Sequence, residues 1–407
     1  MSTYREKSRK SDFESFANKI FTGIKELIPE YAEKRAIWEL FQNALDVIEK
    51  NGIIIIEKTV IGFKFSHNGK PFKDDNIGAL IKQYSSGKTY GDNGEEVGQY
   101  GTGFISTHVY GKNIKINGNI KLDDGTYRDL ENFNLIRNST SPELLTLELL
   151  RQDDYISDLC DNIEKKIEFP QNNITSFEYI ASEINKSSIN KMFEYIHTVL
   201  PYIFCFTTKL DEVIVKENTN DYIYKKISNE NNQLILLKNS TRIVIDYLSN
   251  TDKSIKIVTP QKNNKFNELP RLFLYYPLLD TIETGINFLI HARDFKPNKE
   301  RDFLLKQNNN EEVKNDVERN KGILEDAFDL INKKVLEDDN VDFIEFVKVS
   351  FVDSDVEFEK SIKQNYINII SRLERINVAG NQKRIEEINF FDSELLEKGD
   401  DFLKSFD

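Results

Sequence analysis

The sequence predicts an α+β protein with more than one domain. Helix-like and strand-like patterns alternate up to about residue 205, β patterns dominate from 206 to 310, and helical spacing returns beyond 311. A chain of 407 residues is also longer than an ordinary single domain. We therefore expect three regions: α+β at 1–205, β-rich at 206–310 and helical at 311–407.

Two helices are expected at the start of the chain. In residues 12–28 apolar side chains recur every three to four positions, which is typical of an amphipathic helix that ends before Pro29. A second helix is expected at about 31–50, ending at Asn51-Gly52. Its apolar residues share one face: Ile37, Phe41, Ala44 and Ile48.

The remaining elements follow from the same periodicities. Alternating or β-branched stretches predict strands, at 53–56, 60–66, 113–137, 174–181, 213–215, 234–237, 242–247, 255–258, 272–275 and 286–290. Further helices are expected at 76–84, 142–167, 186–206 and beyond 311. Residues 67–71 predict a turn, and 85–97 predict a long loop rich in Gly, Ser and Asp.

Composition limits the function. Lys and Arg total 55 against 68 Asp and Glu, a net charge of -13. This balance argues against nucleic acid as the main partner, although a local basic groove stays open. The two cysteines, Cys160 and Cys205, form no CxxC pair, so a disulfide scaffold or zinc ribbon is not expected and a reducing compartment fits. With no signal peptide and no apolar span, we expect a cytoplasmic protein without a membrane partner.

Three polar residues share a face of the second helix. Glu39, Asn43 and Asp46 are spaced i, i+4 and i+7, opposite the apolar face. Asn is a poor helix former, so its position invites a functional explanation. A charged face exposed to solvent is the commoner meaning of such a pattern.

Two glycine-containing motifs follow this helix. Residues 67–71 (His-Asn-Gly-Lys-Pro) come directly after a predicted strand and by themselves indicate only a turn. Residues 97–104 (VGQYGTGF) place three glycines ahead of a predicted helix, where the backbone can approach a phosphate. A single glycine cluster is weak evidence for phosphate binding. Its position after the helix that carries Glu39, Asn43 and Asp46 makes a nucleotide site a stronger expectation.

In this order the motifs resemble those of the GHKL ATPases, the superfamily of gyrase, the ninety-kilodalton heat-shock chaperone, histidine kinases and MutL. Residues 39–46 (ELFQNALD) resemble the family's N-box, 97–104 its glycine box, and 85–89 the start of its ATP lid. The resemblance implies a Bergerat-type α/β sandwich that binds ATP. More loosely, residues 271–302 resemble the sacsin-like, chaperone-like branch, in which a transducer-like domain follows the nucleotide domain.

The resemblance also implies roles for individual residues. Glu39 would be the general base for the attacking water, and Asn43 would bind Mg²⁺. Asp46 would lie beside adenine or brace the helix. The remaining nucleotide contacts would be His67, Gly69, Lys88, Gly98, Gln99, Tyr100, Gly101, Thr102, Gly103, Phe104 and Thr175. Lys299 or Arg301 would reach the γ-phosphate, although surface charge in a basic run is an equal alternative for both.

One position departs from the family pattern. Most GHKL proteins begin the glycine turn with Asp, whose carboxylate accepts from the adenine amino group, whereas this chain has His67 there and Pro71 in place of a glycine. A neutral imidazole can accept one hydrogen bond, so adenine recognition in altered form is one outcome. Weak binding, another base preference and a degenerate site are others.

The resemblance implies an ATP-hydrolysing conformational switch that forms a homodimer on binding ATP, with helix 12–28 exchanged between protomers, and with a protein client that the residues do not identify. Two alternatives stay open. One is a nucleotide-gated scaffold or regulatory subunit without turnover, for example in bacterial defence, and the other is a DNA-processing ATPase like MutL or gyrase. A histidine kinase is disfavoured because Glu39 is present and no phospho-acceptor helix is evident.

Overall fold

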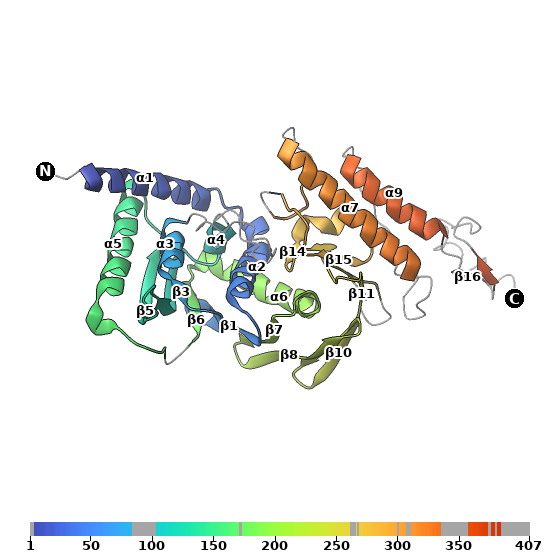
Figure 1. Ribbon diagram of the computed structural model, residues 1–407, viewed down its shortest axis with the longest axis horizontal. Coiled ribbons are helices and arrows are strands. Elements are labelled where there is room, and N and C mark those ends of the chain that lie inside the picture. Colours follow the sequence, from blue (N-terminus) through green and yellow to red (C-terminus); the bar gives the residue numbers. More distant parts are fainter. Residues whose placement is uncertain are drawn as a thin grey trace.

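The chain is a mixed α+β protein, as its sequence predicts, and it is built on one large sheet (Figure 1). The structure is a computed structural model that describes residues 4–83, 103–170, 173–260, 266, 268–298, 301–306, 311–334, 357–372, 376–378 and 381–383. Among the helices it describes, none is long and apolar enough to cross a bilayer.

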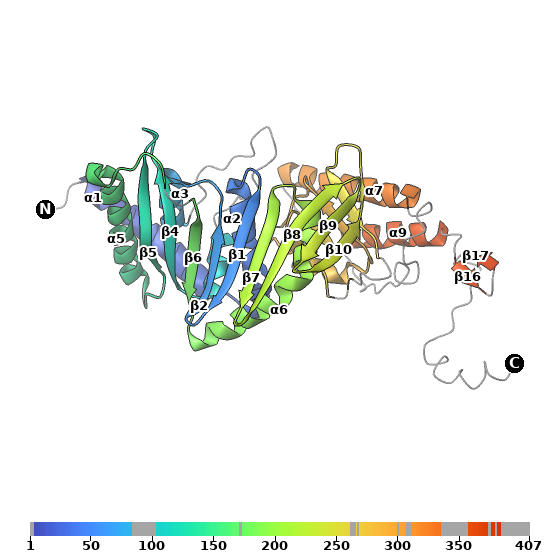
Figure 2. The ribbon, with the colours of Figure 1, turned by 90° about the horizontal axis from the view of Figure 1, so that it is seen from below.

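The large sheet has ten strands, in the order β10-β9-β8-β7-β1-β2-β6-β4-β3, with β5 paired to β4 (Figure 2). Its strands are β1 (Gly52–Thr59), β2 (Gly62–His67), β3 (Phe72–Lys73), β4 (Asn113–Lys121), β5 (Tyr127–Ile136), β6 (Thr175–Ile180), β7 (Leu210–Glu217), β8 (Asn220–Glu230), β9 (Gln233–Lys238) and β10 (Thr241–Asp246).

Two smaller sheets follow along the chain. The first has five strands in the order β11-β12-β15-β13-β14, which are β11 (Leu248–Ser249), β12 (Ile255–Val258), β13 (Leu272–Phe273), β14 (Pro277–Leu278) and β15 (Leu289–Ala292). The second is the pair β16 (Ile376–Val378) and β17 (Asn381–Lys383).

The α-helices are α1 (Tyr4–Lys25), α2 (Pro29–Val47), α3 (Asp74–Lys82), α4 (Gly103–Ser106), α5 (Pro142–Asp161), α6 (Glu183–Phe206), α7 (Glu311–Lys334) and α9 (Glu357–Arg372). Three short 3-10 helices complete the described elements: η1 (Thr107–Val109), η2 (Ile163–Lys165) and η3 (Leu279–Thr284). Helices gather on one side of the large sheet, and α7 and α9 lie side by side at the opposite end of the molecule from α1 (Figures 1 and 2).

Aromatic side chains fill the core between α2, α6 and the sheet. Phe41 of α2 lies edge-on to Phe65 of β2, with ring centroids 5.6 Å apart. Phe63 stacks on Tyr179 across the β2–β6 pair at 4.8 Å. Strand β5 alternates buried and exposed positions, which is typical of a sheet packed on one face only. This core fixes α2 against the strands that carry the candidate site.

The large sheet continues through residue 206. Strand β1 pairs in parallel with β7, joining Ile54 to Val213 and Ile56 to Val215. The regions predicted at 1–205 and 206–310 therefore share one sheet, and β1 lies at the junction, directly after α2.

Several elements differ from the sequence prediction. The region predicted to be helical, 311–407, also contains the strand pair β16–β17, where the β-branched Ile376 and Val378 favour a strand. Helix α1 begins at Tyr4 and ends at Lys25, instead of spanning 12–28. Its first turns are exposed and carry no apolar repeat, and they dock through Arg9, which lies 2.6 Å from Asp153 of α5. Strand β8 was not predicted, because Tyr224 is its only fully buried residue and its sequence is largely polar.

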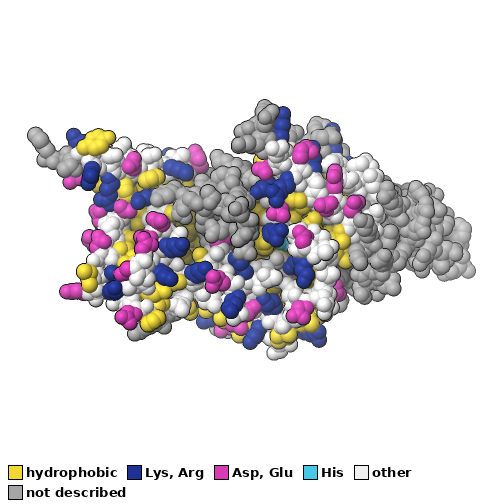
Figure 3. Space-filling model, in the orientation of Figure 1, with side chains coloured by type: hydrophobic (Ala, Val, Ile, Leu, Met, Phe, Trp, Pro, Cys, Tyr) yellow, Lys and Arg dark blue, Asp and Glu magenta, His cyan; other side chains and the backbone are white. Residues whose placement is uncertain are grey.

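The described part of the surface in Figure 3 carries both signs of charge: Lys and Arg side chains are interspersed with Asp and Glu side chains.

Candidate functional site

Glu39 is buried at the centre of a group of polar side chains. Its carboxylate is 6% exposed, although charged helix faces usually point to solvent. Oε2 lies 3.3 Å from Nη1 of Arg301, and Oε1 lies 3.4 Å from Nη2 of Arg35. Arg301 Nη1 also donates to Oε1 of Gln42 at 3.0 Å. We call Arg35, Glu39, Gln42, Gly103 and Arg301 the Glu39 cluster.

Gly103 is the point where the backbone of the glycine motif meets Glu39. A Cβ on Gly103 would lie 1.9 Å from Oε2 of Glu39 and 2.5 Å from its Cδ. No side chain fits at that distance, so the position requires glycine as long as Glu39 keeps its place. Residue 39 on α2 and the end of the glycine motif, which are far apart in sequence, are therefore in contact.

Arg301 reaches the cluster from far along the sequence. It is 5% exposed, so it is not the surface charge that the alternative interpretation expected. Its backbone φ is +57°, an unusual conformation for an arginine. The Arg301 N–H donates to the carbonyl of Asn298 at 3.1 Å, and the Asn298 side chain donates to Asp302 at 2.6 Å. The turn therefore holds the guanidinium toward α2.

A second group of residues surrounds His67 at the end of β2. His67 pairs directly with Thr175 of β6, so both side chains lie on the same face of the sheet. The rings of His67 and Phe104 each lie near Phe177, at centroid distances of 6.4 and 6.1 Å. We call His67, Gly69, Phe104, Thr175 and Phe177 the His67 cluster.

The hydrogen bond of His67 fixes what its ring can do. Burial lowers the pKa of His67 to about 4, so the imidazole is neutral near pH 7. Its Nδ1 accepts from the Gly69 N–H at 3.1 Å. A neutral imidazole whose Nδ1 accepts must carry its proton on Nε2. The second ring nitrogen is therefore a hydrogen-bond donor, whereas the sequence suggested an acceptor.

The turn after His67 packs on the end of α2. A Cβ on Gly69 would lie 2.6 Å from Cγ2 of Val47, and the Lys70 N–H donates to the Val47 carbonyl at 3.0 Å. Thr175 is buried beside this turn, and a Cβ on Gly118 would lie 3.2 Å from its Oγ1. The Glu39 and His67 clusters are thus joined through α2 and through α4, which carries both Gly103 and Phe104.

Two further predicted residues lie on α2 outside these clusters. Asn43 is exposed one turn after Glu39, and Asp46 is half-buried and lines a small cavity near Lys209. Six nucleotide-contact positions and one catalytic position fall outside the described residues: Lys88, Gly98, Gln99, Tyr100, Gly101, Thr102 and Lys299.

Two residues of the Glu39 cluster were not predicted from sequence. Arg35 precedes Glu39 by four positions, a spacing that favours an ion pair on a helix and was readable. Gln42 carried no such signal, because its role depends on Arg301, which is distant in sequence. The buried Nε of Arg35 and Nε2 of Gln42 have no hydrogen-bond partner.

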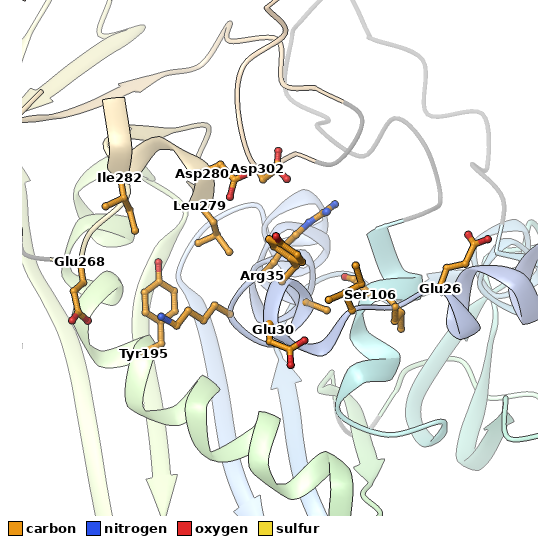
Figure 4. Close-up of a pocket in the computed structure, with 15 residues that line it drawn as sticks. Glu26, Glu30, Arg35, Ser106, Tyr195, Glu268, Leu279, Asp280, Ile282 and Asp302 are labelled. Carbon is orange, nitrogen blue, oxygen red and sulfur yellow. The ribbon is translucent and has the colours of Figure 1, made fainter. Parts of the chain in front are cut away.

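A groove of about 790 Å³ opens beside Arg35 (Figure 4). Figure 4 shows the Arg35 side chain rising from α2 toward the segment that carries Asp280 and Asp302. Ser106 of α4 also lines the groove, and its hydroxyl donates to the Gly103 carbonyl at 2.6 Å. None of the site residues predicted from sequence lines this groove.

The described residues contain no group of three or more His, Cys, Asp or Glu side chains that could hold a metal ion. The magnesium site expected from the resemblance needs only one protein oxygen, from Asn43, with phosphates and waters as the other ligands. The exposed Asn43 amide, one turn from Glu39, fits that requirement.

Neither protein-family models nor curated proteins give a match to this chain. Its function is therefore inferred from the residues and geometry of the two clusters.

Proposed function

We propose that this chain binds ATP with Mg²⁺ and hydrolyses it, acting as a conformational switch of the GHKL type. The observation that carries the proposal is the buried contact between Glu39 and Gly103, with Arg301 bonded to the same carboxylate. A buried carboxylate beside a backbone that excludes a side chain is suited to a base that must approach a phosphate closely. The large sheet with helices on one face supports a Bergerat-type domain.

Each residue of the Glu39 cluster has a role in this proposal. Glu39 would orient the attacking water and take its proton. Arg301 would leave the carboxylate for the γ-phosphate, where its charge stabilises the transition state and frees the base. Asn43 would hold Mg²⁺, which supplies charge neutralisation on the phosphates. Because Arg301 and Arg35 both engage Glu39 in the described state, we infer that this state precedes catalysis.

The test is magnesium-dependent phosphate release from ATP by the purified chain. Turnover that requires Mg²⁺ and saturates with ATP supports the proposal. Saturable binding without turnover would instead favour the nucleotide-gated scaffold. The specific observation in favour of that alternative is that Arg301 and Arg35 both pair with Glu39, so its carboxylate is not available as a base in the described state. The absence of both binding and turnover would overturn the proposal.

His67 is expected to set the base preference of this site. The donor on Nε2 complements an acceptor, such as the 6-oxo group of hypoxanthine, better than the 6-amino group of adenine. We expect His67→Ala to weaken ITP binding about tenfold, because it removes the Nε2 donor, and His67→Asp to shift the ATP-to-ITP affinity ratio toward ATP about tenfold (about 1.4 kcal/mol). Calorimetry with ATP and ITP on all three proteins measures this, and an unchanged ratio in His67→Asp would contradict the role.

ATP-dependent dimerisation is also part of the proposal. In the described structure α1 docks on α5 of its own chain through Arg9, while most of its first three turns are exposed. Surface ion pairs contribute about 0–1 kcal/mol, so the first turns of α1 can be released at low cost. The later turns bury Phe13, Ala17, Ile20 and Ile24, so exchange of the whole helix would require the partner protomer to supply an equivalent apolar surface. Light scattering should detect a dimer with a non-hydrolysable ATP analogue, and a monomer under saturating analogue would remove this part of the proposal.

A further inference from the structure

Gln42, whose amide oxygen accepts from Arg301, also lines a small cavity. The cavity has a volume of about 180 Å³ and is bounded by α2, the connection between α6 and β7, and the five-stranded sheet. Its charged lining residues are Asp46, Lys209, Lys253, Lys256 and Arg293, and its neutral polar ones include Gln42, Thr207, Thr208, Tyr275 and His291. The four basic residues of this lining, Lys209, Lys253, Lys256 and Arg293, belong to neither the Glu39 nor the His67 cluster. The proposed ATP hydrolysis does not use them.

The lining is strongly unbalanced in charge. Four cations face a single carboxylate, Asp46. In the part of the chain that the structure describes, Arg293 lies 3.7 Å from Asp294, and this carboxylate is shared with Arg319 at 3.0 Å. Among the described residues, no carboxylate lies within ion-pair distance of Lys253 or Lys256. An anion in the cavity would offset this excess.

Lys256 is the most informative of the four cations. It is 6% exposed, and its Nζ donates to the Cys205 carbonyl at 2.8 Å. An ammonium group has three donors, so this bond leaves two for a ligand. Burial lowers the pKa of Lys256, and the nearby charges of Lys253 and Lys226 lower it further. Keeping a cation buried among other cations is costly, and a bound anion removes that cost.

The amide of Gln42 adds a neutral donor. Gln42 is 5% exposed, its Oε1 accepts from Arg301, and its buried Nε2 has no hydrogen-bond partner. Unsatisfied buried donors are uncommon and call for an explanation. Lys209 Nζ donates to the Leu45 carbonyl at 2.9 Å, and among the described residues this is its side-chain hydrogen bond, so two of its three donors remain.

The volume selects the kind of anion. Pockets for nucleotides and drug-sized ligands hold roughly 300–1,000 Å³, so this cavity is too small for a nucleotide. It is large enough for one tetrahedral oxyanion with water. We propose that the cavity binds inorganic phosphate or the phosphate group of a small metabolite, held by Lys209, Lys253, Lys256 and Arg293.

Gln42 connects this site to the Glu39 cluster. A ligand that engages its Nε2 alters the same side chain whose Oε1 accepts from Arg301, and Arg301 in turn bonds to Glu39. Phosphate binding would therefore change the availability of Arg301 and modulate ATP turnover. The modulation of ATP turnover rests on the proposed function, whereas the phosphate-binding site does not depend on it.

The primary test is calorimetric titration of inorganic phosphate at constant ionic strength. The informative variant is Lys253→Gln/Arg293→Gln, because both side chains are exposed enough to be replaced without opening the core. The matched control is Lys19→Gln/Arg151→Gln, which removes the same charges from exposed positions on α1 and α5. We expect at least about tenfold weaker phosphate binding in the first variant and about wild-type binding in the control.

Two results would overturn the site. One is the absence of saturable phosphate binding to the wild type. The other is equal affinity in the wild type and in Lys253→Gln/Arg293→Gln, which would locate the phosphate elsewhere, for example beside Gly103.

A second measurement tests the coupling. Phosphate should change ATP turnover of the wild type and leave that of Lys253→Gln/Arg293→Gln unaffected. If phosphate binds with the expected variant dependence while turnover is the same with and without it, the coupling through Gln42 is wrong and the site stands. If the chain does not hydrolyse ATP, the calorimetric titration still decides the site.

Discussion

Replacing Glu39 by Gln is expected to lower ATP turnover by at least about 100-fold, the low end of what a general base contributes. The amide is nearly the same size and its oxygen can still accept from Arg301 or Arg35, so the fold and the Gly103 contact should survive. It cannot take a proton from water. Nucleotide binding should therefore stay within about threefold of the wild type, since the lost interaction belongs to the transition state. Phosphate release and calorimetry with ATP measure the two quantities.

The same helix offers a matched control. Glu33 is also buried, at 5% exposure, and its carboxylate pairs with Lys191 at 2.8 Å, away from the Glu39 cluster. Glu33→Gln should leave turnover within about twofold of the wild type, because the Glu33 carboxylate pairs with Lys191 and not with a residue of the Glu39 cluster. Comparable losses in both variants would mean that the effect is structural. Turnover in Glu39→Gln close to that of the wild type would exclude Glu39 as the base.

Replacing Gly103 by Ala is expected to have the second large effect. The added Cβ would lie 1.9 Å from Oε2 of Glu39, so either the carboxylate or the chain at the start of α4 must move. Glu39 is buried and bonded to two guanidinium groups, and displacing it separates charges that are costly to leave unpaired. A displacement of this kind near reacting groups typically costs about 100-fold in turnover. Steady-state phosphate release measures it.

Gly78 provides the control for this substitution. It lies inside α3, and a Cβ there would meet nothing within 4 Å. Gly78→Ala should keep turnover unchanged and raise the free energy of unfolding by up to about 1 kcal/mol, because Ala favours a helix more than Gly does. If Gly103→Ala and Gly78→Ala have the same rate of ATP turnover, the close approach of Gly103 to Glu39 is not required for catalysis.

Local periodicity predicted α2 because its apolar residues recur at helical spacing and are buried where expected. The same reasoning could not predict the burial of Glu39. That burial depends on Arg301, which lies 262 positions further along the chain and comes close only in the folded protein. Strand β8 was missed for a related reason: its pairing with β7 and β9 stabilises a polar sequence that has no apolar alternation of its own.

The donor character of His67 could not be predicted either. Sequence identifies an imidazole after a strand, but the protonated nitrogen is decided by the Gly69 N–H, which the turn directs at Nδ1. Gly103 is the converse case, since a glycine motif in the sequence already indicated close approach by the backbone. The structure adds the partner of that approach, which is Glu39.

The parallel pairing of β1 with β7 has a consequence for how the chain reaches its native state. Residues 52–57 can complete their hydrogen bonds only after residues up to 216 have been synthesised, and contacts of such long range form slowly. A fragment that ends at residue 205 would leave β1 as an open edge of isoleucines, a template for pairing with other chains. During synthesis the same edge stays exposed until β7 emerges from the ribosome. Fragments that include β7 should therefore aggregate less than a fragment that ends at residue 205, which size-exclusion chromatography can measure.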